Sequence, residues 1–242
     1  MKLGETTQRT IISSGGVEFV LLDTGNIEAI KHQHTNIHLL TGSTIEGQAS
    51  NLYLRVKDSG KYHFTPLIGG SSPSRFGVKD NQVLYVGEFK GVQYNVRLTV
   101  LEYMWFWDVN LSNTTNRELT VDVFYGQDVS LSGGGNPAYI CQYIDHKAFK
   151  KEDNYILCSR QNLGTPHFLE IGSITPTVGY STDGFQFFGL DYKLTNIPEA
   201  LTNEILANEV YQYEFAYLAL QSESINLTAN ETENVVFYGA YE

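Results

Sequence analysis

The sequence has 242 residues, a formal net charge of −11 and 16 tyrosines, but only two cysteines, Cys141 and Cys158. Its acidic balance argues against binding to nucleic acid or to an anionic membrane, because both partners reward basic patches. No apolar run reaches the ~18 residues of a membrane-spanning helix. The polar start also lacks the apolar core of a secretory signal, so we expect a cytoplasmic protein with reduced thiols.

Alternating apolar residues between glycine- and asparagine-rich turns predict an all-β fold, a large antiparallel β-sandwich with one short helix. We expect residues 1–14 to be a flexible terminus or an edge strand, and residues 15–242 to form a single sandwich domain. The helix is expected at 198–206, where proline occupies the first turn. The expected strands are 17–22, 27–32, 36–40, 51–57, 62–68, 83–89, 92–101, 105–111, 118–128, 155–159, 167–172, 185–190, 211–220 and 235–241, with one more ending at His146.

The stretch from residue 105 to residue 146 carries the clearest pattern. Two apolar-alternating runs, 105–111 and 118–128, are joined by a polar turn, which is the pattern of a β-hairpin. Trp105 and Trp107 lie on the apolar face of the first run, so we expect both indoles in the core.

The polar side chains of this stretch stand at expected strand ends. Gln127 and Asp128 end one strand and His146 ends another, with the glycine-rich loop 132–136 between them. The pattern therefore predicts that these side chains face a common loop region.

These motifs, in this order, resemble the N-terminal β-sandwich of a known enzyme family. The motifs are Tyr125-Gly126-Gln127-Asp128, the glycine-rich loop, Asn136-Pro137-Ala138-Tyr139 and Gln142-Tyr143-Ile144-Asp145-His146. They resemble the inverting β-glucoside phosphorylases of glycoside hydrolase family 94, formerly glycosyltransferase family 36. That family includes cellobiose phosphorylase, 1,2-β-oligoglucan phosphorylase and the cyclic 1,2-β-glucan synthases.

The resemblance extends from about residue 15 to the C-terminus and is clearest over 85–160, where the 1,2-β-oligoglucan branch is most similar. The family more often has a Ser-Tyr-Ala-Glu strand end and a His-Pro-Ala-Phe start at the corresponding positions. The resemblance implies a supersandwich of the galactose mutarotase-like kind. In the family a catalytic (α/α)6 barrel follows this sandwich, and we expect these 242 residues not to include it.

The family's general acid and phosphate pocket lie in that barrel, so the resemblance implies that this chain alone is not catalytic. We expect no catalytic residue, no metal ligand and no cofactor. The implied role is to bind a β-gluco-oligosaccharide and to support assembly, as a homodimer or with a helical-barrel catalytic domain. Sugar sites combine aromatic faces with planar polar groups. The candidate binding residues are Tyr125, Gln127, Asp128, Asn136, Tyr139, Gln142, Tyr143, Asp145 and His146.

Other functions remain open at this point. A stand-alone carbohydrate-binding module would bind sugar without any missing partner. An enzyme resembling aldose 1-epimerase would need a histidine and a carboxylate on either side of the sugar, and His146 or His167 with Asp128 or Asp145 could be tried. A purely structural scaffold would bind no glycan.

Three histidines form a further cluster in the sequence. On a straight strand, His32, His34 and His38 would project from one face, and three imidazoles can hold zinc. However, His34 and His38 would then lie about 13 Å apart, too far to share one ion. Only a turn at Thr35 and Asn36 could bring them together, and a solvated strand edge is the simpler interpretation.

Overall fold

The computed structural model describes residues 8–79 and 81–242, and in these residues strands dominate over three short helices and one 3-10 turn. The expected all-β class is confirmed. The strands are β1 (Arg9–Ile12), β2 (Val17–Leu21), β3 (Ile27–His32), β4 (Thr35–Asn36), β5 (Asn51–Asp58), β6 (Lys61–Pro66), β7 (Arg75–Lys79), β8 (Gln82–Phe89), β9 (Val92–Leu101), β10 (Met104–Asn113), β11 (Leu119–Asp128), β12 (Ile144–Lys151), β13 (Asn154–Gln161), β14 (His167–Ser173), β15 (Thr177–Asp183), β16 (Ala216–Ser222), β17 (Ile225–Leu227) and β18 (Thr232–Tyr241).

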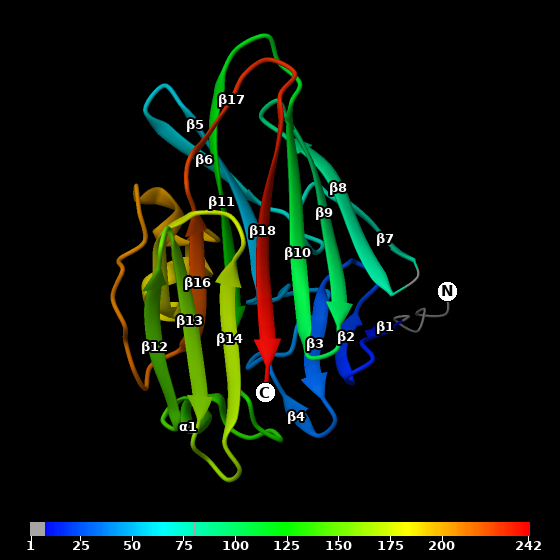
Figure 1. Cartoon of the computed structure of the whole chain (residues 1–242), viewed down its shortest axis with the longest axis vertical. Helices are drawn as coiled ribbons and strands as arrows, with labels where there is room; N and C mark the ends of the chain where they lie inside the picture. The colour runs from blue at the N-terminus through cyan, green and yellow to red at the C-terminus, as the bar shows by residue number, and fades with distance from the viewer. Residues whose placement is uncertain (1–7, 80) are drawn as a thin grey trace.

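These strands form three antiparallel sheets (Figure 1). The largest has eight strands in the order β12-β13-β14-β18-β10-β9-β8-β7, and the second has the order β15-β16-β11-β5-β6, with β17 also paired to β11. A small sheet, β1-β2-β3-β4, packs at one end. There the ring centroids of Phe19 and Trp105 lie 5.5 Å apart. In this sheet β1 is an edge strand. Residues 1–7 lie outside the described part.

The core between the two large sheets follows the alternation of the sequence. Every second residue of β10 is buried, so Trp105 and Trp107 lie inside, with at most 1% of their surface exposed. The core position expected for both indoles is confirmed. Trp105 Nε1 donates a hydrogen bond of 2.9 Å to the Tyr125 hydroxyl on β11, which joins the two sheets across the core.

The hairpin expected from 105–111 and 118–128 is wrong. Strand β10 pairs with β9 and β18 in the large sheet, whereas β11 pairs with β5 and β16 in the second sheet. The polar turn between them carries the chain from one layer of the sandwich to the other. Because both strands bury an apolar face toward the same core, their alternation is equally compatible with a hairpin and with this crossing.

The helical segments differ from the single helix that the sequence predicts. Helices α1 (Pro137–Cys141), α2 (Gly184–Phe188) and α3 (Tyr192–Thr195) lie in segments expected to be strand or loop, and only a 3-10 turn, η1 (Glu199–Thr202), forms within 198–206. Helix α2 replaces the strand expected at 185–190, because the Asp183 carboxylate accepts a hydrogen bond from the Gln186 N–H and caps a helix there.

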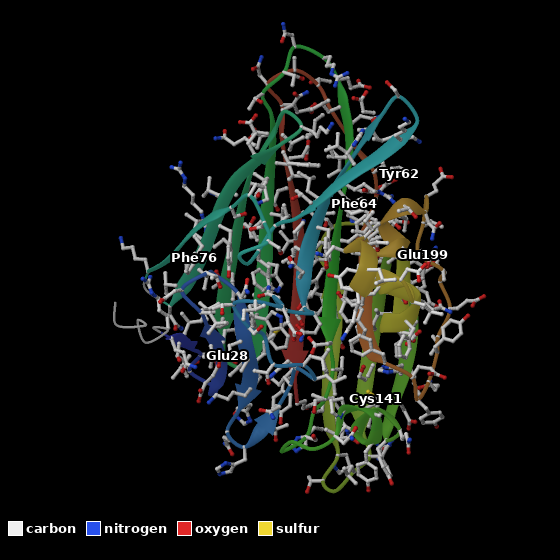
Figure 2. All side chains as sticks on the ribbon, turned by 180° about the vertical axis from the view of Figure 1, so that it is seen from behind. Glu28, Tyr62, Phe64, Phe76, Cys141 and Glu199 are labelled. Carbon is white, nitrogen blue, oxygen red and sulfur yellow. The ribbon has the colours of Figure 1, made fainter. Side chains whose placement is uncertain are left out.

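A buried arginine explains why the chain leaves the helical path after η1. The Arg55 guanidinium donates hydrogen bonds to the backbone carbonyls of Leu201, Asn203 and Glu204, which a longer helix would use internally. Its other bonds form a fork to both carboxylate oxygens of Asp122. Figure 2 shows this side of the molecule, with Tyr62 and Phe64 of β6 beside the segment that carries Glu199.

Candidate functional site

Four of the predicted binding residues lie inside the sandwich and are bonded to protein groups. Tyr125 is buried in the core, where its hydroxyl donates to Gln127 Oε1 at 3.1 Å. Burial raises the pKa of the Tyr125 hydroxyl, so this phenol stays neutral. The Gln127 amide in turn donates to the Asp128 carbonyl at 2.9 Å. These two side chains therefore reach the core and not a surface loop.

The Asp128 carboxylate, the third of the four, is also buried. It accepts hydrogen bonds from the backbone N–H groups of Leu39 and Leu40, at 2.8 and 2.6 Å, and from the Ser50 hydroxyl. Because its three donors lie near the two ends of the 37–50 connection between β4 and β5, the carboxylate fixes this connection to the end of β11.

His146, the fourth, does not end a strand as the sequence predicts. Helix α1 occupies 137–141, so strand β12 begins only at Ile144 and His146 is its third residue. The ring is buried, and its Nδ1 lies 2.8 Å from the Ser159 hydroxyl oxygen. Burial lowers the pKa of the imidazole to about 4, so His146 is neutral near pH 7.

The other predicted residues lie on the surface around α1. Asn136 caps this helix, since its side-chain oxygen accepts from the Ala138 N–H at 3.0 Å, and Gln142 follows the helix and is exposed. Tyr139 is 49% exposed, and its ring centroid lies 5.0 Å from that of Tyr143. A hydrogen bond with Tyr139 that favours the neutral phenol raises the pKa of the Tyr143 hydroxyl. Cys141, labelled in Figure 2, marks the buried side of this helix.

Asp145 links this pair of rings to two residues that the sequence analysis did not find. Asn162 Nδ2 donates to Asp145 Oδ2 at 2.8 Å and to the Tyr143 carbonyl at 3.2 Å. The hydroxyl of Tyr213, which is 57% exposed, lies 3.4 Å from Asp145 Oδ1. We call Tyr139, Tyr143, Asp145, Asn162 and Tyr213 the tyrosine patch.

The tyrosine patch combines three phenol rings with a carboxylate and an amide. Such rings pack against the apolar C–H faces of sugars, and planar polar groups receive or donate hydrogen bonds to hydroxyls. Asn162 and Tyr213 carry no local signal in the sequence. They join the patch only through the pairing of β12 with β13 and through the path of the 209–215 segment.

Two adjoining hollows lie between α2 and η1, and the second also borders the 209–215 segment. Their volumes are about 290 and 340 Å³, and Gln186 and Glu199 line both. Tyr211 and Glu214 line the second hollow. None of the residues considered for an epimerase, His146, His167, Asp128 and Asp145, lines either hollow.

The three histidines of the 32–38 segment do not converge. The strand turns after His32, and His38 is buried with its Nδ1 bonded to the backbone of Ile30. His32 instead bonds the Gly15 carbonyl at 3.1 Å. Among residues 8–79 and 81–242 there is no group of histidine, cysteine and acidic side chains placed to hold a metal ion.

Comparison with known proteins identifies the chain's relatives. The model of the SOGP N-terminal domain matches residues 20–239. The chain belongs to this family. A 1,2-beta-oligoglucan phosphorylase of Listeria innocua serovar 6a is 32% identical over 222 residues, which are 89% of this chain and 20% of that protein. The resemblance to β-glucoside phosphorylases is thus confirmed, and the chain spans about a fifth of that relative's length.

Solved structures share the fold at low sequence identity. A polysaccharide lyase superimposes with a TM-score of 0.58 and 10% identity, over 100% of this chain and 33% of its own. A putative aldose 1-epimerase from Escherichia coli K12 superimposes with a TM-score of 0.54 and 9% identity, over 98% of this chain and 99% of its own. The expected galactose mutarotase-like sandwich is confirmed. At these identities the likeness concerns the fold alone.

Two further expectations concern the state of the cysteines and the presence of a membrane-spanning helix. Cys141 and Cys158 are both free thiols, and burial raises the pKa of Cys158 to about 11. In the described part of the chain, the helices are all too short to span a lipid bilayer.

Proposed function

We propose that this chain is the sugar-recognising sandwich domain of a β-gluco-oligosaccharide phosphorylase, and that it binds its glycan at the tyrosine patch. The observation that carries the proposal is the bonding within the tyrosine patch. Asn162 donates to the Asp145 carboxylate and to the Tyr143 carbonyl, and the Tyr213 hydroxyl lies 3.4 Å from Asp145. The exposed Tyr139 ring packs beside that of Tyr143. Of the buried candidates, His146 supports the patch from behind, since it follows Asp145 on β12 and bonds Ser159. Tyr125, Gln127 and Asp128 bond groups in the core and in the 37–50 connection, and we assign them no part in the patch. The Listeria relative's name supports a preference for β-1,2 linkages.

We also propose that the domain contributes binding and not chemistry. An inverting reaction at a glycosidic bond needs an acid at the leaving oxygen and a nucleophile on the opposite face. Within the described residues, the tyrosine patch holds one carboxylate, Asp145, and its oxygens accept hydrogen bonds from Asn162 and Tyr213. Phosphorolysis would then be carried out by another part of a longer enzyme.

The binding half of the proposal is tested by calorimetric titration of the 242-residue chain with β-1,2-, β-1,3- and β-1,4-linked gluco-oligosaccharides. Saturable binding selective for β-1,2 chains is expected, and Tyr139→Ser should weaken it. Tyr103→Ser is the matched control, because Tyr103 is 50% exposed but contacts His32 away from the patch. Equal affinity of both variants and the wild type would remove the patch from the proposal.

The assembly half rests on an exposed apolar segment around α3. Leu190 and Leu194 are 87% and 88% exposed, and Ile197 is 46% exposed. We call these three residues the apolar segment. Large side chains gathered in this way on a soluble surface mark a contact with another protein unit. We propose that the apolar segment packs against a second copy of the chain or a catalytic barrel.

Sedimentation of the chain at increasing concentration tests this packing. The wild type should self-associate, and the double variant Leu190→Ser, Leu194→Ser should remain monomeric with unchanged secondary structure. If the wild type is monomeric at every concentration, the apolar segment is not a self-contact and the homodimer is excluded as its occupant.

A further inference from the structure

The outer face of the eight-stranded sheet carries aromatic side chains that lie outside the tyrosine patch. Phe168 on β14 is 42% exposed, and Tyr238 on β18 and Phe106 on β10 are partly exposed. Figure 1 shows this face toward the viewer, with no helix across β14, β18 and β10. We call Phe168, Tyr238 and Phe106 the aromatic row.

The Tyr238 side chain packs across the neighbouring strand, β14. Its cross-strand partner is Gly172, and a Cβ atom at that position would lie only 2.3 Å from Tyr238 Cζ. The ring therefore occupies the space that any other residue at 172 would fill. Its hydroxyl donates to Glu170 Oε1 at 2.8 Å, and the Phe106 ring lies 6.5 Å away. Together these contacts fix an aromatic surface on the open sheet, of the kind that stacks against a sugar ring.

Planar polar groups continue this surface along the same two strands, β10 and β18. Asp108 accepts hydrogen bonds from the side-chain amides of Asn110, at 2.9 Å, and Asn234. Carboxylate and amide groups next to a fixed aromatic ring form the donor and acceptor set that recognises sugar hydroxyls.

The charges on this face alternate in sign across the strands. Asp145 pairs in register with Arg160, and Asp108 with Arg97. Neighbouring charges of opposite sign largely cancel at a distance, and salt screens what remains. At these two pairs neither sign of charge prevails, and this balance fits an uncharged glycan.

The aromatic row continues from the tyrosine patch without a break in the sheet. Asp145, Arg160 and Phe168 are consecutive neighbours across β12, β13 and β14. The Arg160 guanidinium lies 5.6 Å from the centre of the Phe168 ring. From Asp145 to Tyr238 the register steps three strands across, about 14 Å, and four residues along, about 13 Å. One sugar ring cannot span this separation, but a chain of several can.

We propose that the aromatic row is a second binding surface for uncharged glycans, and that a long gluco-oligosaccharide occupies the row and the tyrosine patch together. This proposal deepens the proposed function, because it assigns the domain to chains of several sugars. It predicts that affinity rises with chain length until both surfaces are filled.

Calorimetric titration with β-1,2-linked gluco-oligosaccharides of increasing length, beginning with the disaccharide, tests the proposal. Phe168→Ser should lower the affinity for long chains about three- to tenfold, the usual range for one aromatic contact, and leave the disaccharide unaffected. Tyr238→Leu should act in the same way while still covering Gly172. Phe149→Ser is the matched control, because Phe149 is 51% exposed on the same face but lies on the edge strand β12.

The outcomes separate this proposal from the proposed function. Loss of long-chain affinity in Phe168→Ser, with the fold intact by circular dichroism, supports the row even if Tyr139→Ser has no effect. Long-chain affinity equal to the wild type in both row variants overturns the row, whatever Tyr139→Ser does. Affinity that does not rise with chain length also overturns it. Tighter binding of polygalacturonate, an anionic polymer, than of the uncharged chains would overturn it as well.

Discussion

Gln212 holds the backbone of His146 with both ends of its side-chain amide. Its Oε1 accepts from the His146 N–H at 2.7 Å, and its Nε2 donates to the His146 carbonyl at 2.8 Å. The amide thus completes two backbone hydrogen bonds of β12, as a neighbouring strand would. Because Tyr213 and Asp145 are the adjacent residues, this contact brings the Tyr213 hydroxyl next to the Asp145 carboxylate.

Replacing Gln212 with alanine should therefore weaken glycan binding without unfolding the chain. Two hydrogen bonds are lost, each worth about 1 kcal/mol of stability, and Tyr213 is released from Asp145. We expect at least a threefold loss of affinity in calorimetry and a free energy of unfolding about 2 kcal/mol lower. Gln82→Ala is the control, because the Gln82 amide bonds the Thr99 hydroxyl on the neighbouring strand β9. Unchanged affinity in Gln212→Ala would show that Tyr213 does not contribute to binding.

Burial of His146 predicts a pH-dependent stability. The folded pKa of about 4 lies below the unfolded value of about 6.5, so between these values the unfolded chain binds the extra proton. Stability must then fall as the pH drops through this window, and the full stability is present above it. Between pH 7 and pH 5 this histidine should account for a loss of about 2 kcal/mol.

Urea unfolding of the wild type and of His146→Gln at both pH values measures this contribution as a difference. The variant should lose about 2 kcal/mol less than the wild type on acidification. His34→Gln, at an exposed position, should follow the wild type. An equal pH dependence in wild type and His146→Gln would mean that the imidazole is protonated in the folded state.

The sequence predicts the strands of this fold better than their partners. The alternation in β10 places both indoles correctly in the core, because the side-chain period of a strand is a local property. Which sheet a strand joins is not local, so β10 and β11 look like a hairpin although they lie in opposite layers. The helix expected at 198–206 fails for a similar reason, since Arg55, far away in the chain, takes its carbonyls.

The candidate site shows the same difference between local and non-local information. Tyr139, Tyr143 and Asp145 are contributed by one short stretch, and sequence reasoning names them among its nine candidate binding residues. Asn162 and Tyr213 join them only through strand pairing and through the Gln212 contact. The alternation of a strand also explains why Asp145 reaches the surface while His146 is buried. The two residues are adjacent, so they face opposite sides of β12.

Tryptophan fluorescence should not respond to glycan binding, although both indoles belong to the stretch nearest the patch in sequence. Trp105 and Trp107 are almost fully buried, and the Trp105 N–H is bonded to Tyr125 in the core. A ligand on the tyrosine patch or on the outer sheet face does not reach them. Calorimetry should therefore detect binding at glycan concentrations that leave the emission maximum unchanged. A saturable shift of that maximum would indicate that binding rearranges the core.

Removing the Tyr125 hydroxyl should destabilise the core. In Tyr125→Phe the Trp105 N–H loses its acceptor, and an unpaired buried donor costs about 1–3 kcal/mol. Thermal or urea unfolding measures the loss, and glycan affinity should be unchanged because the ring itself remains. Tyr85→Phe offers a matched comparison, since the Tyr85 hydroxyl is equally buried and donates to the Gly25 carbonyl at 2.8 Å. A stability equal to the wild type would show that water or a shifted side chain replaces the bond.

The Arg55–Asp122 pair should be strongly coupled, because each side chain is almost fully buried and neutralises the other. Leaving one buried charge alone typically costs about 3–5 kcal/mol. We therefore expect Arg55→Leu and Asp122→Leu each to destabilise the chain by about this amount. The double variant should be more stable than the sum of the two losses, because it leaves no unpaired charge.

Urea unfolding of the four proteins completes this double-mutant cycle, and hydrogen exchange adds a local measurement. The Arg55 side chain also holds the carbonyls of Leu201, Asn203 and Glu204, so exchange at 201–206 should accelerate in Arg55→Leu and in the double variant. In Asp122→Leu, Arg55 keeps these carbonyls as acceptors, and exchange there should change less. Strictly additive losses, or equal exchange in the two single variants, would contradict the view that Arg55 shapes the chain after η1.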